Sequence, residues 1–241
     1  MPRFKNFDKI DKNIPVLIAG QTASGKSQIA IDIAEKQGGI IINADAIQVY
    51  KNWRILTARP SRIDEAKINH KLYGHIDGTT DYSVGTWLKE VQDILSSNSR
   101  PIIVGGTGLY FSALTKGLVD IPEISETIRR EAKNRIKKNG FESLAGEIDE
   151  ETLQKIDKNN PVRVQRAWEV LRSTGRSLTS WHQETPKPTL DLRMCKAILV
   201  DGEVSVINNR INTRFDQMIE KGLIQEAEDN RATWNPSNPS S

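Results

Sequence analysis

A glycine-rich segment near the N-terminus has the residue types needed to bind phosphate. It fits the pattern G-x-x-x-x-G-K-[ST], which fixes four positions. In this pattern, backbone N–H groups surround a phosphate group, the lysine adds positive charge, and the last hydroxyl suits Mg²⁺ coordination. An ordinary glycine turn is the alternative, but the expected strand before it and helix after it favour a phosphate loop. The predicted phosphate-binding residues are Gly20, Gln21, Thr22, Ala23, Ser24, Gly25, Lys26 and Ser27, with Ser27 as the candidate Mg²⁺ ligand.

Two further polar segments follow apolar runs. Asp45 comes directly after the run 40–42, and Thr107 lies in the glycine-rich segment 105–108, after the run 102–104. The carboxyl ends of parallel strands face the ligand crevice, so we expect both residues near the phosphate loop. Asp45 could be a general base, a metal ligand or a helix cap. The segment with Thr107 could instead be a plain turn, and the third run lacks the terminal Asp of many nucleotide hydrolases.

The elements that must position these residues form an α/β pattern. Short apolar runs alternate with amphipathic helical patterns, which favours right-handed crossovers and a parallel sheet covered on both faces. Strand patterns vanish in the middle of the chain, where charged helical patterns replace them. We therefore predict a P-loop NTPase-like parallel sheet flanked by helices, with an all-helical insertion domain. The predicted boundaries are 1–124 and 186–241 for the core, 125–185 for the insert, 1–13 for a flexible tail and 234–241 for a disordered end.

Composition restricts the class of protein. The net charge is +3, which neither demands nor forbids a nucleic-acid partner. One cysteine excludes an intramolecular disulfide, and the histidines and cysteine lack zinc-finger spacing. The N-terminus is polar, and no apolar run approaches the ~18 residues that span a bilayer. By elimination we expect a cytoplasmic protein with no membrane partner.

Arginines in the predicted insert could contact phosphate. A helix is expected to begin at Asn160-Pro161, with asparagine as the cap and proline in the first turn. Arg163 and Arg166 then lie one turn apart beside its apolar face. Guanidinium groups suit phosphate, but a solvated helix face is the usual explanation for them, and the same holds for Arg129.

Taken together, these motifs resemble the tRNA dimethylallyltransferase family, also called tRNA isopentenyltransferases. The likeness extends in order over roughly residues 14 to 233. The matching segments are 20–27, 45–50, 57–60, 75–77, 82–83, 104–110, 160–167, 214–218 and 222–223.

The resemblance implies an activity and roles for residues. The family transfers a dimethylallyl group from dimethylallyl diphosphate to N6 of adenine 37, next to the tRNA anticodon. The phosphate loop would then hold an isoprenoid diphosphate with Mg²⁺, Asp45 would be the general base, and Thr107 would contact the target nucleotide. The insert would bind the anticodon arm, and we expect a monomer. The implied tRNA-binding positions are Asp45, Ala46, Ile47, Gln48, Thr107, Arg129, Val162, Arg163, Val164, Gln165 and Arg166.

The sequence departs from the family pattern, and other functions compete. Gln21 and Ala46 replace the usual proline and serine. The family's Arg- and Lys-rich C-terminal helices have no counterpart, which predicts a truncated member. A P-loop kinase for a small molecule or nucleotide is the main alternative. Isopentenylation of free adenine nucleotide is closer in chemistry, and a non-catalytic RNA-binding protein is the least favoured.

Overall fold

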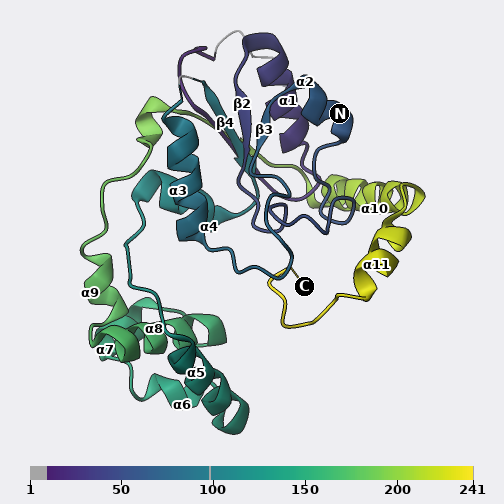
Figure 1. The fold of residues 1–241 in the computed structure, drawn as a ribbon. Coiled ribbons are helices and arrows are strands. Elements are labelled where there is room, and N and C mark those ends of the chain that lie inside the picture. Colours follow the sequence, from purple (N-terminus) through teal and green to yellow (C-terminus); the bar gives the residue numbers. More distant parts are fainter. Residues whose placement is uncertain (1–9, 98, 241) are drawn as a thin grey trace. The chain divides into compact units, whose positions relative to one another are not determined.

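The computed structural model describes residues 10–97 and 99–240, which form two compact units (Figure 1). One unit contains the described residues up to Lys116 and those from Pro188 onward. The other is Gly117–Lys187. In the first unit the elements are β1 Val16–Gly20, α1 Lys26–Gln37, β2 Ile40–Asn43, α2 Arg62–Lys67, β3 His70–Lys71, α3 Val84–Leu95, β4 Pro101–Gly105, α4 Gly108–Lys116, β5 Lys196–Val200, α10 Val204–Glu220 and α11 Leu223–Arg231.

The sheet of the first unit has the order β3-β2-β4-β1-β5, and every pair is parallel. The three inner strands, β2, β4 and β1, are mostly apolar and mostly buried, as expected when helices cover both faces. Strand β4 lies between β1 and β2 in the sheet. The connection from β1 through α1 to β2 therefore crosses over the position of β4. This arrangement confirms the predicted P-loop NTPase-like sheet flanked by helices.

Helices pack on both faces because each has an apolar stripe. Ile29, Ala30, Ile33 and Ala34 of α1 pack on one face of the sheet. Helices α3 and α4 lie side by side (Figure 1), and Trp87 of α3 is completely buried. The strand before the phosphate loop and the helix after it are thus both packed in the core, which fixes the two ends of the loop.

Strand β3 was not predicted from the sequence. It has two residues and pairs with β2 from Ile41 to Ile42. Two residues are too few to show an alternation of apolar and polar side chains in the sequence. The pairing with β2 is what defines this strand. It brings the segment 70–77 alongside the strand end that carries Asp45.

The second unit is entirely helical in regular structure, with a core of its own. Asn160 caps α8 through its side-chain oxygen, which accepts from Val162 N and Arg163 N at 3.1 and 3.2 Å, so the predicted helix start is confirmed. The buried Trp168 donates to Glu147 Oε2 at 2.7 Å, which satisfies its indole N–H. The helices are α5 Glu126–Asn139, α6 Glu142–Ala145, α7 Glu150–Lys155, α8 Pro161–Thr174 and α9 Leu178–His182.

The chain ends bear on two further predictions. Most of the tail predicted to be flexible lies outside the described residues, as does the last residue of the end predicted to be disordered. Residues 234–240 have no helix or strand, but Trp53 Nε1 donates to Ser240 O at 2.9 Å.

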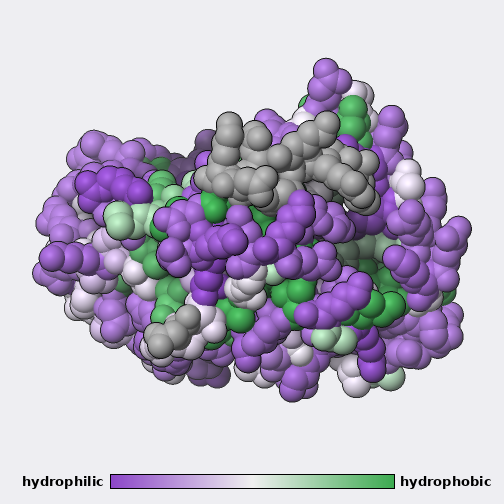
Figure 2. All heavy atoms as spheres, turned by 90° about the horizontal axis from the view of Figure 1, so that it is seen from above, coloured by the Kyte–Doolittle hydropathy of each residue, from purple (hydrophilic) through white to green (hydrophobic). Residues whose placement is uncertain are grey.

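None of the helices in the described part of the chain is long and apolar enough to cross a membrane. Figure 2 shows a mostly hydrophilic face, with hydrophobic side chains largely in its hollows.

Candidate functional site

The phosphate loop has the backbone of an anion site. Ala23 and Gly25 have positive φ angles, 60° and 97°, so the chain turns tightly before α1 begins. Gly25 has no side chain to cap this helix end, and the positive end of the helix dipole faces the loop. The buried Ser24 hydroxyl makes no hydrogen bond with any residue that the structure describes. Unused donors at a helix N-terminus fit a phosphate group.

Gly20, the first residue of the loop, is required by close packing. A Cβ at this position would lie 2.5 Å from Val200 O on the neighbouring strand β5. Any side chain would push β1 and β5 apart, because a backbone oxygen cannot move away cheaply. The predicted phosphate-binding residues therefore begin at the last residue of β1, pass through the loop 21–25 and end in the first turn of α1, at Lys26 and Ser27.

Lys26 points its amino group across the loop. Its Nζ donates to Gln21 O at 3.0 Å. Burial lowers the pKa of Lys26, the nearby Asp45 carboxylate raises it in part, and the Arg214 guanidinium lowers it further. Lys26 and Arg214 line the same groove, and the Asp45 carboxylate lies beside Gly20 at the start of the phosphate loop.

Asp45 is fixed by the residue two positions before it. The completely buried Asn43 side chain accepts from Asp45 N and donates to Asp45 O, both at 2.9 Å. It also donates to Leu72 O at 3.0 Å, which ties Asp45 to the segment after β3. Trp87 Nε1 donates to Asn43 O at 2.7 Å and secures the strand end. The sequence analysis gave Asn43 no role, although a polar residue that ends an apolar strand was a usable signal.

The Asp45 carboxylate has one engaged oxygen. Oδ1 accepts from Ile47 N at 3.1 Å, so the side chain does hold its own turn. Oδ2 faces the glycines: a Cβ built on Gly106 would lie 3.8 Å from it and 3.6 Å from Gly20 O. The phosphate loop, Asp45 and the loop after β4 therefore meet at one edge of the sheet, as predicted.

Thr107 joins the loop after β4 to the loop after β2. Its hydroxyl oxygen accepts from Ala46 N at 2.9 Å, and its own N–H donates to Ala44 O at 3.1 Å. The chains approach so closely that a Cβ on Gly105 would lie 2.0 Å from Ala44 O. The Thr107 hydroxyl proton stays available to a ligand, since its oxygen is the acceptor in the bond to Ala46.

The remaining predicted tRNA contacts of the first unit differ in accessibility. Ala46 is exposed and the Ile47 side chain is 55% exposed, so both can touch a ligand. Gln48 is half-buried, and its amide nitrogen donates to Thr57 O at 2.7 Å and to Ala58 O at 3.3 Å. Its side chain therefore supports the next loop.

Within the second unit, the predicted contacts divide into surface and core. Val162 and Arg163 are exposed, whereas the Val164 side chain is 0% exposed and packs in the core. The prediction that Val164 contacts tRNA is therefore wrong for its side chain, because helix period places it on the inner face. Gln165 is half-buried and donates to Glu169 at 2.7 Å.

Arg129 and Arg166 form a basic pair in the second unit. Arg166 is exposed to solvent; partial desolvation by its neighbours lowers its pKa, the Glu169 carboxylate raises it, and the Arg129 guanidinium lowers it again. Arg129 and Arg166 are carried by α5 and α8, two helices that pack against each other. Two like charges on packed helices suit an anionic ligand.

A groove of about 1240 Å³ opens beside the phosphate loop in the first unit. Its walls are the loop with the start of α1, the segment 54–62 and one face of α10. The sequence analysis gave Arg214 of α10 no role. Burial lowers the pKa of Arg214, and the Asp45 carboxylate raises it, so this guanidinium belongs to the site. The four-residue spacing from Arg210 to Arg214, which places both on one helix face, was the available signal.

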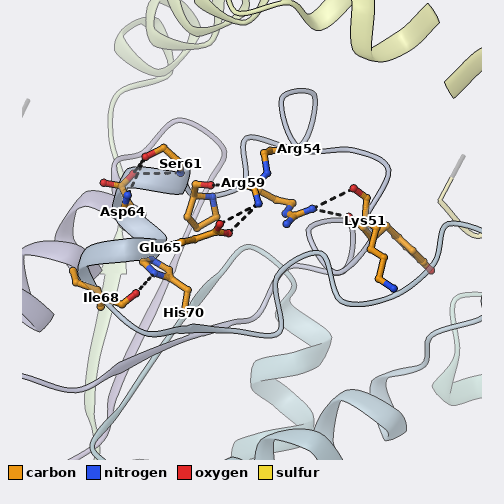
Figure 3. Close-up of polar contacts among 10 residues, drawn as sticks. Lys51, Arg54, Arg59, Ser61, Asp64, Glu65, Ile68 and His70 are labelled. Carbon is orange, nitrogen blue, oxygen red and sulfur yellow. Dashed lines mark hydrogen bonds and ion pairs between the residues drawn. The ribbon is translucent and has the colours of Figure 1, made fainter. Parts of the chain in front are cut away.

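The wall formed by residues 54–62 is held by its own polar contacts (Figure 3). Arg54 donates to Glu65 at 3.0 Å and to Pro60 O at 2.8 Å, and Arg59 donates to Lys51 O at 3.4 Å. Glu226 of α11 accepts from three successive backbone N–H groups, 54, 55 and 56, at 2.7 to 3.0 Å. This side of the groove is therefore held in place, and Arg54 and Arg59 are used to build it.

Comparison with known proteins identifies clear relatives. The family profile described as IPP transferase matches residues 48–240, and one described as isopentenyl transferase matches residues 14–75. A tRNA dimethylallyltransferase of Ruegeria sp. is 49% identical over 235 residues, which are 98% of this chain and 80% of the relative. One from Cereibacter sphaeroides is 50% identical over 227 residues, 94% of this chain and 78% of the relative.

Solved structures show the same fold. A eukaryotic dimethylallyltransferase acting on tRNA aligns with a TM-score of 0.74 and 26% identity, over 92% of this chain and 56% of that chain. A full-length tRNA isopentenylpyrophosphate transferase from Bacillus halodurans aligns with a TM-score of 0.60 and 28% identity, over 95% and 73%.

Proposed function

The chain belongs to the IPP transferase family, that of the tRNA dimethylallyltransferases, so it is a transferase that prenylates tRNA, and we propose which of its groups perform each step. The donor is dimethylallyl diphosphate and the acceptor is N6 of adenine 37. The observation that supports this assignment is that Lys26 and Arg214 line one groove, while the Asp45 carboxylate lies beside the start of the phosphate loop and acts on the pKa of both cations. Two cations and one carboxylate there match a departing diphosphate and a proton to be removed.

In the proposed reaction, the adenine amine attacks C1 of the dimethylallyl group. The bond from C1 to the diphosphate oxygen breaks, and the bonding pair leaves with the diphosphate. Lys26, Arg214 and the loop N–H groups stabilise this negative charge, which grows as the bond lengthens. Asp45 Oδ2 takes the proton from the attacking nitrogen, while Oδ1 stays bound to Ile47 N.

Thr107 and the basic pair of the second unit would bind the acceptor. The Thr107 hydroxyl can donate to the target nucleotide, since its oxygen is already the acceptor from Ala46 N. Arg129, Arg163 and Arg166 are suited to backbone phosphates. The target base must leave its stack to reach Asp45, as enzymes that modify bases generally require.

Mg²⁺ is the proposed cofactor. Mg²⁺ binds few protein ligands and takes most of its oxygens from phosphates and water. The exposed Ser27 hydroxyl in the first turn of α1 fits such a site, and the described residues contain no cluster of three or more His, Cys, Asp or Glu side chains that would form a metal cage. When bound, Mg²⁺ would neutralise charge on the leaving diphosphate.

Incubation with labelled dimethylallyl diphosphate and one acceptor at a time tests the proposal. We expect label in tRNA, and none in AMP. Label in AMP alone would establish the free nucleotide as acceptor and contradict the tRNA assignment. A tRNA whose adenine 37 is replaced by guanine is the matched control and should stay unlabelled. We expect a cytoplasmic enzyme, since tRNA is the acceptor, and we propose that it acts as a monomer.

A further inference from the structure

One face of α10 lines the groove along the helix. The groove-lining residues recur at spacings of three and four, so they share one side of the helix. Most of them offer a cationic, amide or hydroxyl donor, which are the groups that contact nucleic-acid phosphates. They are Val206, Asn209, Arg210, Thr213, Arg214, Gln217 and Met218, followed directly after the helix by Lys221.

The cations on this face divide into one inner and two outer groups. Arg214 is the groove cation whose charge acts on the pKa of Lys26, so it belongs with the phosphate loop. Arg210 and Lys221 lie on either side of it along the chain. With a rise of 1.5 Å per residue, they are about 6 Å and about 10 Å away along the helix axis. A diphosphate held between Lys26 and Arg214 would not occupy these outer positions.

The outer cations have no structural role that would explain them. On the opposite wall, Arg54 and Arg59 are bonded within their own loop (Figure 3). The side chains of Arg210 and Lys221 make no hydrogen bond or ion pair with any residue in the described part of the chain, and neither does the side chain of Arg62 at the start of α2. The groove also has more room than the roughly 300–1000 Å³ of ordinary small-molecule sites.

We propose that Arg210 and Lys221 of the α10 face, together with Arg62, bind the phosphate backbone of single-stranded RNA on both sides of the target nucleotide. This inference rests on the proposed function. The reacting amine must reach Asp45, which interacts with Arg214, so the neighbouring nucleotides must pass close to α10. From Arg210 to Lys221 the face is about 16 Å long. That length corresponds to about five nucleotides at 3.4 Å per stacked residue.

The test compares two double variants with the same change in charge. The first is Arg210→Gln with Lys221→Gln. The matched control is Lys67→Gln with Lys89→Gln, because both of these lysines are exposed in the same unit and lie outside the groove. tRNA affinity is measured at several salt concentrations for both variants and the unaltered chain. Each lost phosphate contact to a single strand lowers the slope of log affinity against log salt by about 0.7.

We expect the magnitude of this slope to decrease by about 1.4 in the groove variant and to stay unchanged in the control. Pyrophosphate affinity should change by less than twofold in both, since the phosphate loop and Arg214 are intact. Equal slopes in the two variants would overturn the inference. Weaker AMP or ATP binding at an unchanged tRNA slope would also overturn it, in favour of a nucleotide ligand. Failure of the proposed function is seen separately, in the unaltered chain, as no label transferred to tRNA.

Discussion

Charged groups are held differently in the two units. The comparison is between Asp45 at the sheet edge of the first unit and Arg163 on the surface of the second. At the sheet edge, Asp45 is held through both backbone polar groups by the completely buried Asn43. In the second unit, Arg163 is exposed at the start of α8, and only its backbone N–H is fixed by the Asn160 cap. A group that moves a proton needs a fixed position, whereas a group that attracts a phosphate backbone needs mainly its charge.

This difference predicts the largest effect for Asp45→Asn. Asparagine keeps the size of the side chain and can still accept from Ile47 N, but it cannot take up a proton. We expect the single-turnover transfer rate to fall by ~10²–10⁴-fold, with tRNA and dimethylallyl diphosphate still bound. If pyrophosphate binding in Mg²⁺ fell along with the rate and extra Mg²⁺ restored it, Asp45 would be a metal ligand. Near-normal turnover would show that Asp45 serves only to hold its turn, through the bond from Ile47 N.

Asn43→Ala tests whether fixed geometry matters at the sheet edge. The change removes the three hydrogen bonds that hold Asp45 and Leu72, and it leaves polar groups of the backbone unpaired. We expect kcat to fall by up to ~10²-fold, because small displacements of reacting groups have effects of that size. KM for tRNA should hardly change. Asn208→Ala on the exposed side of α10 is the control, and an equal loss of kcat in the control would remove the special role of Asn43.

Lys26→Ala should weaken diphosphate binding while the fold stays intact. The loss of one charge-assisted contact in a partly desolvated site costs ~2–3 kcal/mol, or about 30- to 150-fold in affinity. Titration calorimetry with pyrophosphate measures the change, and circular dichroism checks the fold. Unchanged affinity would refute the assignment of Lys26 to the diphosphate.

Replacing Arg163 and Arg166 together by Gln should have a smaller and different effect. If both contact RNA phosphates, the salt slope of tRNA binding should fall by about 1.4. Pyrophosphate affinity should not change. A preserved slope would show that these arginines only form a solvated helix face. The proposed difference between the two units would then be wrong.

The smallest effect concerns pH. Burial lowers the pKa of Lys26 below its ordinary value of 10.5, so the folded protein loses this proton before the unfolded chain does. In that window the free energy of unfolding rises with pH, while pyrophosphate affinity falls as the cation is lost. Pyrophosphate titrations between pH 8 and pH 10.5 should show the fall, and Lys26→Arg should move it to higher pH. A fall at the same pH in Lys26→Arg would exclude Lys26 as its source.

The sequence by itself determined the segment of the phosphate loop, the parallel sheet apart from β3, and the helical insert. These features depend on local patterns: apolar runs of strand length, glycines at fixed spacing, and a helix capped by Asn160. It also placed Asp45 and Thr107 at the ends of neighbouring strands, because parallel strands end at one edge. Family resemblance, and not spacing, supplied their chemical roles.

Only the tertiary structure decided which side chains are free to act. Val164 is in the core because the inner face of α8 packs on α5 and α6, although the family resemblance counted it among the tRNA contacts. Arg214 joins the site from a helix more than a hundred residues away from Thr107, and Glu226 fixes the loop from 54 to 56 from a comparable distance. Such contacts arise from packing between distant segments, and packing depends on the whole fold.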